Sequence, residues 1–291
     1  MSAVARVIEG RPRDLGGFSV RRLLPASGKQ TIGPFIFFDH MGPAVFALGQ
    51  GVDVRPHPHI GLATVTYLFE GEFVHRDSLG TVQVISPGDV NWMVAGRGIV
   101  HSERTPPEAR LRAQGSRIHG IQTWVALPKP GEDVEPTFVH HPASDLPEIR
   151  YAGCVLRLIA GEGWGERSPV AVSSPTMYAD ADLSSGATLE LPVEVAERGV
   201  YVAQGEIDVD GRRHGVGEVV EFATGAAAVI SAMGDSRVMA FGGAPLDGPR
   251  YIWWNFVSSS RERLDQAKRD WRDERFAPVP GDPERIPLPE Q

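Results

Sequence analysis

The sequence predicts an all-β protein with two β-barrels and one helix near the C-terminus. From residue 18 to residue 248, short apolar runs such as residues 64–69, 82–85 and 121–127 alternate with Gly and Pro. Apolar runs of this length, bounded by turn residues at short spacing, are typical of a β-sandwich or barrel rather than of βαβ units. Glycine supplies the turns between them, for example in residues 77–80 and 86–89.

A weak internal repeat indicates that the barrel occurs twice. In the first half, residues 67–72 are followed by a turn, a strand and the turn at residues 87–89. In the second half, residues 202–207 are followed by the turn at residues 210–211, a short strand and residues 217–218. Two copies of one small barrel explain this pattern most simply.

A linker between the two repeats and a helix near the C-terminus complete the expected organisation. Prolines and acidic residues over residues 128–146 indicate a linker, so we expect an N-terminal barrel over residues 1–135 and a C-terminal barrel over residues 136–291. Near the end of the second part, residues 259–262 form a capping-box pattern. A charged helix is therefore predicted over residues 261–276, with Leu264, Ala267 and Trp271 able to share one face, followed by a proline-rich tail.

Composition excludes several classes of function. A formal net charge of -8 argues against direct binding to nucleic acid, which requires clustered Lys and Arg. The single cysteine, Cys154, excludes an internal disulfide and fits a reducing compartment. No apolar run approaches the length of a membrane span, and residues 1–14 lack the apolar centre of a signal peptide. We therefore expect a cytoplasmic protein that binds a small molecule or another protein.

Two short motifs, His-Pro-His and His-Ser-Glu, are the strongest candidates for a functional site. His57 and His59 stand two positions apart, and so do His101 and Glu103. Side chains two apart on a strand point to the same side, so each pair can aim together if these residues lie on strands. Should the two strands meet, three imidazoles and one carboxylate converge. Such a set suits one divalent transition metal, with iron the first choice and zinc, manganese, nickel, cobalt and copper also compatible.

Other histidines are expected to be structural. His75 and Asp77 fall at a predicted hairpin turn, where we expect them to be exposed to solvent. His214 is the one histidine beyond Pro142, so the second barrel has no evident ligand set.

A structural metal would use the same ligand types as a catalytic one. A scaffold without metal would require the four candidate ligands to lie too far apart to share an ion.

Several segments resemble the pirin family of the cupin superfamily. Residues 55–71 resemble the first motif of that family and residues 87–103 resemble its second, while residues 38–43 and 253–258 also look pirin-like. The resemblance implies a bicupin, with two tandem jelly-roll-like cupin barrels and a metal in the N-terminal one only. It also implies a non-haem iron, Fe(II), held by His57, His59, His101 and Glu103.

Pirins are linked to two kinds of activity, and both are hypotheses for this chain. In the first, the protein is a quercetin 2,3-dioxygenase that cleaves a flavonol with O₂. Glu103 would then act as metal ligand and as the base that accepts the hydroxyl proton, and Trp92 or Met93 would line the substrate site. The alternative is an iron-dependent regulatory or redox-sensing protein that binds a transcription factor or a metabolic enzyme. The fold alone does not decide between them.

Two positions depart from the family pattern. Many pirins carry Arg and Glu where this chain has Ile60 and Ala63. The metal ligands are unaffected, because the carboxylate ligand of pirins comes from the second motif. An acid that could move a proton or orient a bound water is missing at Ala63, so we expect the substrate range to differ from that of other pirins.

Overall fold

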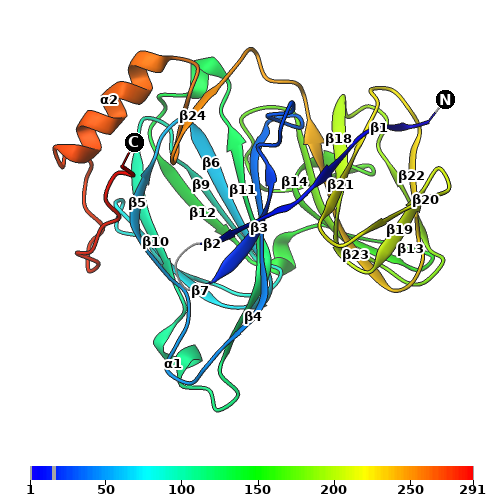
Figure 1. The fold of residues 1–291 in the computed structure, drawn as a ribbon, viewed down its shortest axis with the longest axis horizontal. Helices are drawn as coiled ribbons and strands as arrows, with labels where there is room; N and C mark the ends of the chain where they lie inside the picture. Colours follow the sequence, from blue (N-terminus) through cyan, green and yellow to red (C-terminus); the bar gives the residue numbers. More distant parts are fainter. Residues whose placement is uncertain (1, 15–17, 291) are drawn as a thin grey trace. The chain divides into compact units, whose positions relative to one another are not determined.

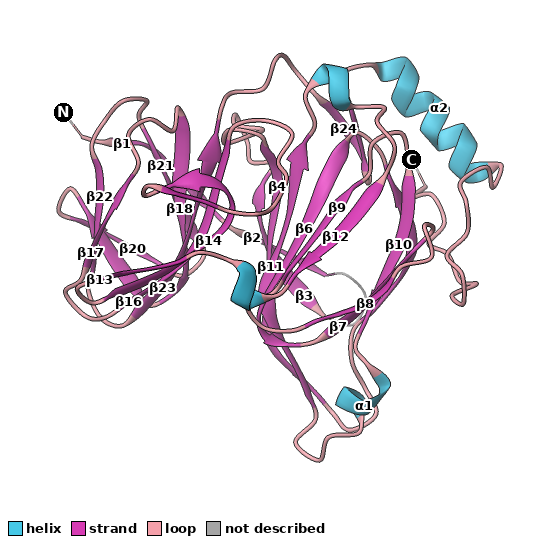
Figure 2. Ribbon diagram, turned by 180° about the vertical axis from the view of Figure 1, so that it is seen from behind, coloured by secondary structure: helices cyan, strands magenta, loops and turns pink. Residues whose placement is uncertain are grey.

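The computed structural model describes residues 2–14 and 18–290. Strands dominate the described residues, which confirms the all-β prediction (Figures 1 and 2). The chain divides into two compact units, each built from separate stretches of sequence. Unit 1 contains Val20–His40 and Ser144–Leu246, whereas unit 2 contains Met41–Ala143 and the segment that begins at Asp247. The predicted division into consecutive domains, residues 1–135 and 136–291, stays a prediction. The compact units are not consecutive in sequence, because the segment from Asp247 onward belongs to unit 2.

Most of unit 1 consists of two antiparallel sheets around one apolar core. Side chains such as Leu158, Val200 and Ile230 are fully buried in that core, because β-branched and other apolar residues alternate along its strands. Cys154 is buried there, and burial raises the pKa of its thiol to about 11. The larger sheet has the order β1 (Val4–Glu9), β21 (Glu218–Phe222), β18 (Glu197–Gln204), β23 (Ser236–Gly243), β16 (Thr176–Leu183), β14 (Cys154–Gly163) and β13 (Glu148–Tyr151), with β15 (Glu166–Arg167) on β14; the smaller sheet has the order β17 (Thr188–Leu191), β22 (Ala228–Ala232), β19 (Glu206–Val209) and β20 (Arg212–Gly215).

Unit 2 contains the sheets that carry the candidate metal ligands. One has the order β5 (Asp53–His59), β10 (Ile99–Arg104), β7 (Phe73–Asp77) and β8 (Val82–Ile85). The other contains, in order, β12 (Thr137–His141), β9 (Val90–Val94), β6 (Leu62–Gly71) and β11 (Ser116–Ala126). Earlier in the chain come β2 (Arg11–Asp14), β3 (Ser19–Leu24) and β4 (Phe35–Phe46), and the last part of β4 lies in unit 2. Short helical turns are α1 (Pro107–Arg110), η1 (Lys129–Gly131) and η2 (Ala143–Asp145).

The C-terminal part of unit 2 forms a hairpin and a helix. Strands β24 (Tyr251–Trp253) and β25 (Phe256–Ser258) pair with each other, and α2 (Arg261–Arg272), orange in Figure 1, packs on them. The predicted apolar face of the helix is confirmed, since Leu264, Ala267 and Trp271 are buried. Among the described residues, no helix has the length and apolar character needed to cross a membrane.

Helix α2 begins at Arg261 as predicted, but it ends at Arg272 and not at residue 276. Its N-cap is Ser260, whose hydroxyl accepts a hydrogen bond from the backbone N–H of Arg263 at 3.2 Å, whereas the capping-box pattern placed the cap at Ser259. The cause is Glu132, whose carboxylate accepts hydrogen bonds from both the backbone N–H and the hydroxyl of Ser259. The Ser259 hydroxyl hydrogen points to Glu132, and the Ser260 hydroxyl is the one that accepts from the first turn of the helix.

A buried ion pair anchors this C-terminal segment. The Arg250 side chain is 0% exposed, and its Nε lies 2.7 Å from Oε1 of Glu132. Arg250 also donates to the carbonyl of Leu127 at 2.8 Å, and Ser258 donates to Glu132 at 3.1 Å. Arg250 also pairs with Asp247 at 2.5 Å, but the Asp247 side chain is 41% exposed. Removing Glu132 therefore takes away the buried partner of the Arg250 charge, and such a loss costs more than the pair itself contributes.

We predict that Glu132→Ala lowers the free energy of unfolding by about 3–5 kcal/mol, because Arg250 loses its buried carboxylate partner. Urea denaturation measures the change. The matched control is Glu135→Ala, since the ion pair of Glu135 with Arg97 is solvent-exposed (62% for Arg97 and 70% for Glu135) and should contribute about 0.5 kcal/mol or less. Equal losses in the two variants would contradict the role given to the buried pair.

Candidate metal centre

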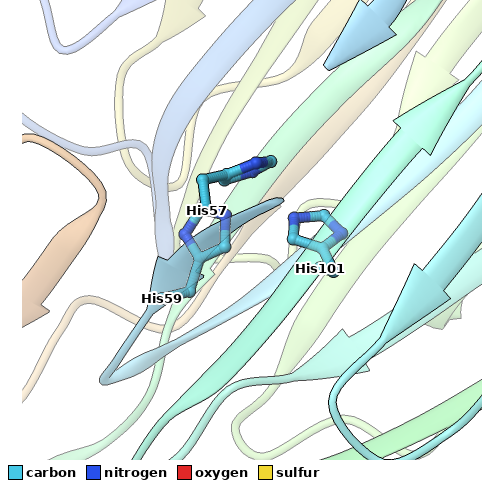
Figure 3. A group of neighbouring side chains, drawn as sticks. All are labelled: His57, His59 and His101. Carbon is cyan, nitrogen blue, oxygen red and sulfur yellow. The ribbon is translucent and has the colours of Figure 1, made fainter. Parts of the chain in front are cut away.

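The two strands that carry the predicted ligands are neighbours. Strands β5 and β10 pair antiparallel, with His57 directly opposite His101 and with His59 opposite Ile99. The ring centroids of His57 and His101 lie 4.4 Å apart, and those of His59 and His101 lie 5.1 Å apart. Figure 3 shows the three rings gathered at one place between the strands. The meeting of the two strands, on which the metal prediction depended, is therefore confirmed.

Hydrogen bonds leave one nitrogen of each ring for a metal. His57 donates from Nδ1 to the carbonyl of Arg55 at 2.9 Å, and His59 donates from Nδ1 to the carbonyl of Asn255 at 3.1 Å. A carbonyl can only accept, so Nε2 of both rings carries the lone pair. Nε2 of His101 is buried with no hydrogen-bond partner. The three histidines can each offer one nitrogen, and these atoms lie within 4.8 Å of one another.

The charge state of these histidines suits a metal. Burial lowers the pKa of His57 to about 4. Burial also lowers the pKa of His59 and of His101 well below the ordinary value, and neighbouring imidazoles lower both further. All three rings are therefore neutral near pH 7, which is the form that binds a metal ion. A buried acceptor nitrogen without a partner is costly unless a cation satisfies it, so the residues present fit the metal.

Glu103 lies two residues after His101 on β10 and has a ligand atom near that of His101. The register of β10 against β5 shifts between His101 and Glu103, and the extra residue lies in β5, where Val54 pairs with Glu103 and His57 with His101. Strand β10 pairs with β7 without a shift, so Glu103 stays on the same face as His101. Its Oε1 accepts a hydrogen bond from the Thr66 hydroxyl at 2.7 Å, and burial raises the pKa of its carboxyl group. Ligand atoms of Glu103, His101 and His75 lie within 4.8 Å of one another. His101 thus belongs to both groups, and binding of one ion by all four predicted ligands stays a prediction.

The expectation that His75 and Asp77 are exposed is wrong. They are 2% and 0% exposed, because β7 pairs with β10 and places Asp77 opposite His101 and His75 opposite Glu103. The sequence carried a weak signal for this, since Phe73, His75 and Asp77 have the period of two that marks one face of a strand. The sequence pattern placed these residues in a turn, but they lie on β7 and the turn begins after Asp77.

Aromatic side chains line the site. The Trp124 ring lies 5.1 Å from that of His59 in an edge-to-face arrangement, and the Phe138 ring stacks on His75 at 4.3 Å. The sequence pattern pointed to Trp92 or Met93 instead, and both of these are buried on β9. Ile60 and Ala63, where an arginine and a glutamate were noted as usual for the family, are each 1% exposed.

Comparison with known proteins agrees with this architecture. Residues 17–125 match the family described as Pirin, and residues 178–277 match the Pirin C-terminal cupin domain. The chain belongs to the pirin family. The resemblance noted in the sequence and the expected pair of cupin-type domains are thereby confirmed.

The similarity to other pirins and to related proteins extends over nearly the whole chain. A pirin-like protein of Caulobacter vibrioides is 50% identical over 288 residues, which is 98% of this chain and 99% of that protein. A Pseudomonas aeruginosa protein named "Putative quercetin 2,3-dioxygenase" is 40% identical over 89% of this chain and 80% of its own length. The crystal structure of a quercetin 2,3-dioxygenase from Acinetobacter baumannii superimposes with a TM-score of 0.91 at 34% identity, covering 98% of this chain and 95% of that one.

We predict that Co(II) raises the midpoint of thermal unfolding of the wild-type protein, because an ion that binds only the folded state stabilises it. At a free concentration 100 times the dissociation constant, the gain is about 2.7 kcal/mol. In His101→Ala the shift should be lost, since His101 belongs to both groups of ligand atoms. His140→Ala serves as the control, because His140 bonds to Asn91 outside the site. An unchanged Co(II) shift in His101→Ala would contradict the assignment.

Proposed function

We propose that this pirin is a metal-dependent dioxygenase that opens the ring of flavonol-like compounds, of the quercetin 2,3-dioxygenase type. One divalent ion, with Fe(II) the first choice, would be held by three residues of the histidine cluster and by one carboxylate. The observation that carries the proposal is the cluster of three neutral imidazoles with Nε2 unprotonated, beside a buried carboxyl group. The ligands proposed are His57, His59, His101 and Glu103.

When bound, a redox-active ion with open coordination positions supplies a path for electrons between a flavonol and O₂, which react slowly by themselves. The side chains have separate tasks. His57 and His59 are fixed by carbonyl groups, so their rings do not need to turn when a substrate arrives. His57 and Glu103 are each 7% exposed, whereas His59 and His101 are each 1% exposed.

Glu103 is proposed as the group that takes up the substrate's hydroxyl proton. The Thr66 hydroxyl holds Oε1 at 2.7 Å, which fixes the orientation of the carboxyl group. A fixed acceptor within reach of the substrate oxygen is the geometric requirement for general base catalysis. Trp124 would lie against a flat aromatic substrate, since its ring already contacts His59.

The names of similar proteins support the proposal. Quercetin 2,3-dioxygenase is the printed name of the Acinetobacter baumannii structure at 34% identity, and of the Pseudomonas aeruginosa relative with the qualifier quoted above. The regulatory alternative, in which the iron state changes a surface that binds a transcription factor or enzyme, stays a prediction from the sequence, as does a cytoplasmic location.

We predict that the protein loaded anaerobically with Fe(II) consumes O₂ when quercetin is added. His59→Ala and Glu103→Gln should each lower the rate more than about 100-fold, because even changes outside the ligand set of a metal site cost 10- to 100-fold. An oxygen electrode measures the rate. Glu135→Gln, an exposed carboxylate, should retain the wild-type rate. Absence of uptake with one iron bound per chain would contradict the flavonol assignment.

A further inference from the structure

The three clustered histidines differ in the hydrogen-bond partner of Nδ1, the nitrogen that is not proposed to bind the ion. Backbone carbonyls accept from Nδ1 of His57 and of His59. Nδ1 of His101 instead lies 3.4 Å from Nδ1 of His75, a second buried imidazole. The far nitrogen of His75, Nε2, lies 3.0 Å from Oδ2 of Asp77. A chain of three side chains thus runs outward from the centre, from His101 through His75 to Asp77.

The far end of this chain fixes the direction of every hydrogen bond in it. Oδ1 of Asp77 accepts from the backbone N–H groups of Leu79 at 2.9 Å and Thr81 at 3.0 Å, so Asp77 is held in the turn between β7 and β8. A carboxylate only accepts, and therefore His75 carries its proton on Nε2 and donates it to Asp77. With the ring proton on Nε2 alone, Nδ1 of His75 is an acceptor.

The same logic determines the form of His101. Because Nδ1 of His75 accepts, the proton of His101 lies on Nδ1 and is donated to His75. Nε2 of His101 is left with its lone pair, and this is the atom that is buried without a hydrogen-bond partner. The hydrogen bonds therefore select the tautomer of His101 that can bind an ion through Nε2.

We propose that His75 and Asp77 form a positioning pair that fixes the tautomer and the ring orientation of His101 and thereby raises the affinity of the centre for its metal ion. The inference rests on the metal centre described above and goes beyond the proposed reaction, since it holds for any ion bound there. The pair is rigid because both side chains are buried, at 2% and 0% exposure, and because the Phe138 ring stacks on His75 with an angle of 20°.

Partners of this kind commonly tune metal sites, because a ligand imidazole that donates its second N–H is oriented and made more basic. The acceptor for His101 is the imidazole of His75, which is itself hydrogen-bonded to the carboxylate of Asp77, and not a single carbonyl or carboxylate. His101 is also the ligand shared by both groups of metal-binding atoms. Its orientation consequently affects the whole centre more than that of His57 or His59.

The first variant is Asp77→Asn. The amide oxygen must stay with the N–H groups of Leu79 and Thr81, so the amide NH₂ turns toward His75 and forces its proton onto Nδ1. His75 can then no longer accept from His101. We expect the affinity for Co(II), measured by competition with a chelator, to fall about 10- to 100-fold, and the visible absorption spectrum of the bound Co(II) to change.

The control is Asp89→Asn, which makes the same chemical change in a carboxylate that also holds a turn. Oδ2 of Asp89 accepts from the backbone N–H of Ser86 at 3.0 Å, and its Oδ1 accepts from that of Ala143 at 2.9 Å. We expect wild-type Co(II) affinity and spectrum in this variant. A loss equal to that of Asp77→Asn would mean that turn stability alone explains the effect, and would overturn the proposal.

Two substitutions of His75 separate positioning from direct ligation. His75→Phe keeps the ring and its packing against Phe138 but removes the acceptor, and it should lose as much Co(II) affinity as Asp77→Asn. His75→Asn can place its carbonyl oxygen near the former Nδ1 position, and it should recover most of the affinity and the wild-type spectrum.

Three results would overturn the proposal. The first is an Asp77→Asn variant that binds Co(II) as tightly as the wild type. The second is an equal loss in His75→Asn and His75→Phe, which would make His75 a ligand of the ion itself. The third is a wild-type protein that binds no Co(II), which would overturn the metal centre as well. Lack of oxygen uptake with quercetin would leave the proposal intact, because the experiment measures binding.

Discussion

The antiparallel pairing of β5 with β10 is the constraint on which the metal centre depends. It places His57 opposite His101, while the alternation of side chains along β5 brings His59 to the same face. A shift of the pairing by one residue would turn these rings to the opposite face and disperse the cluster. The next strand, β7, adds His75 and Asp77 through its own register with β10. The centre is thus a property of three neighbouring strands and not of one motif.

A segment from the far end of the chain completes the arrangement in unit 2. His59 donates to the carbonyl of Asn255, and the next residues of the two segments, Ile60 and Phe256, form a parallel bridge. Gly61 allows this approach, because it has a φ of +69° and a Cβ at that position would lie 2.0 Å from the carbonyl oxygen of Val257. The ion pair of Glu132 with Arg250 fixes the start of the same segment. The orientation of His59 therefore depends on residues almost 200 positions later.

Local patterns in the sequence were enough to predict the strands, the apolar face of α2 and the two pairs of candidate ligands. They failed where the outcome depended on a distant partner. His75 and Asp77 were misassigned because their burial follows from pairing with β10, and the N-cap of α2 was misplaced because Glu132 occupies Ser259. The irregular register beside Glu103, and the contact of Trp124 with His59, could not be foreseen for the same reason. Spacing along a strand predicts which side chains share a face, but not which strands will meet.

The central claim is that one ion binds between His57, His59 and His101, with Glu103 beside them. Anomalous X-ray diffraction from crystals grown with Co(II) tests it most directly, because the signal locates the ion without reference to any activity. We predict one peak in unit 2, about 2.1 Å from Nε2 of each of the three histidines, as for divalent ions bound by imidazole elsewhere, with a carboxylate oxygen of Glu103 as a further ligand. A peak bound by His75 in place of His57 and His59, or no peak at this position, would contradict the account.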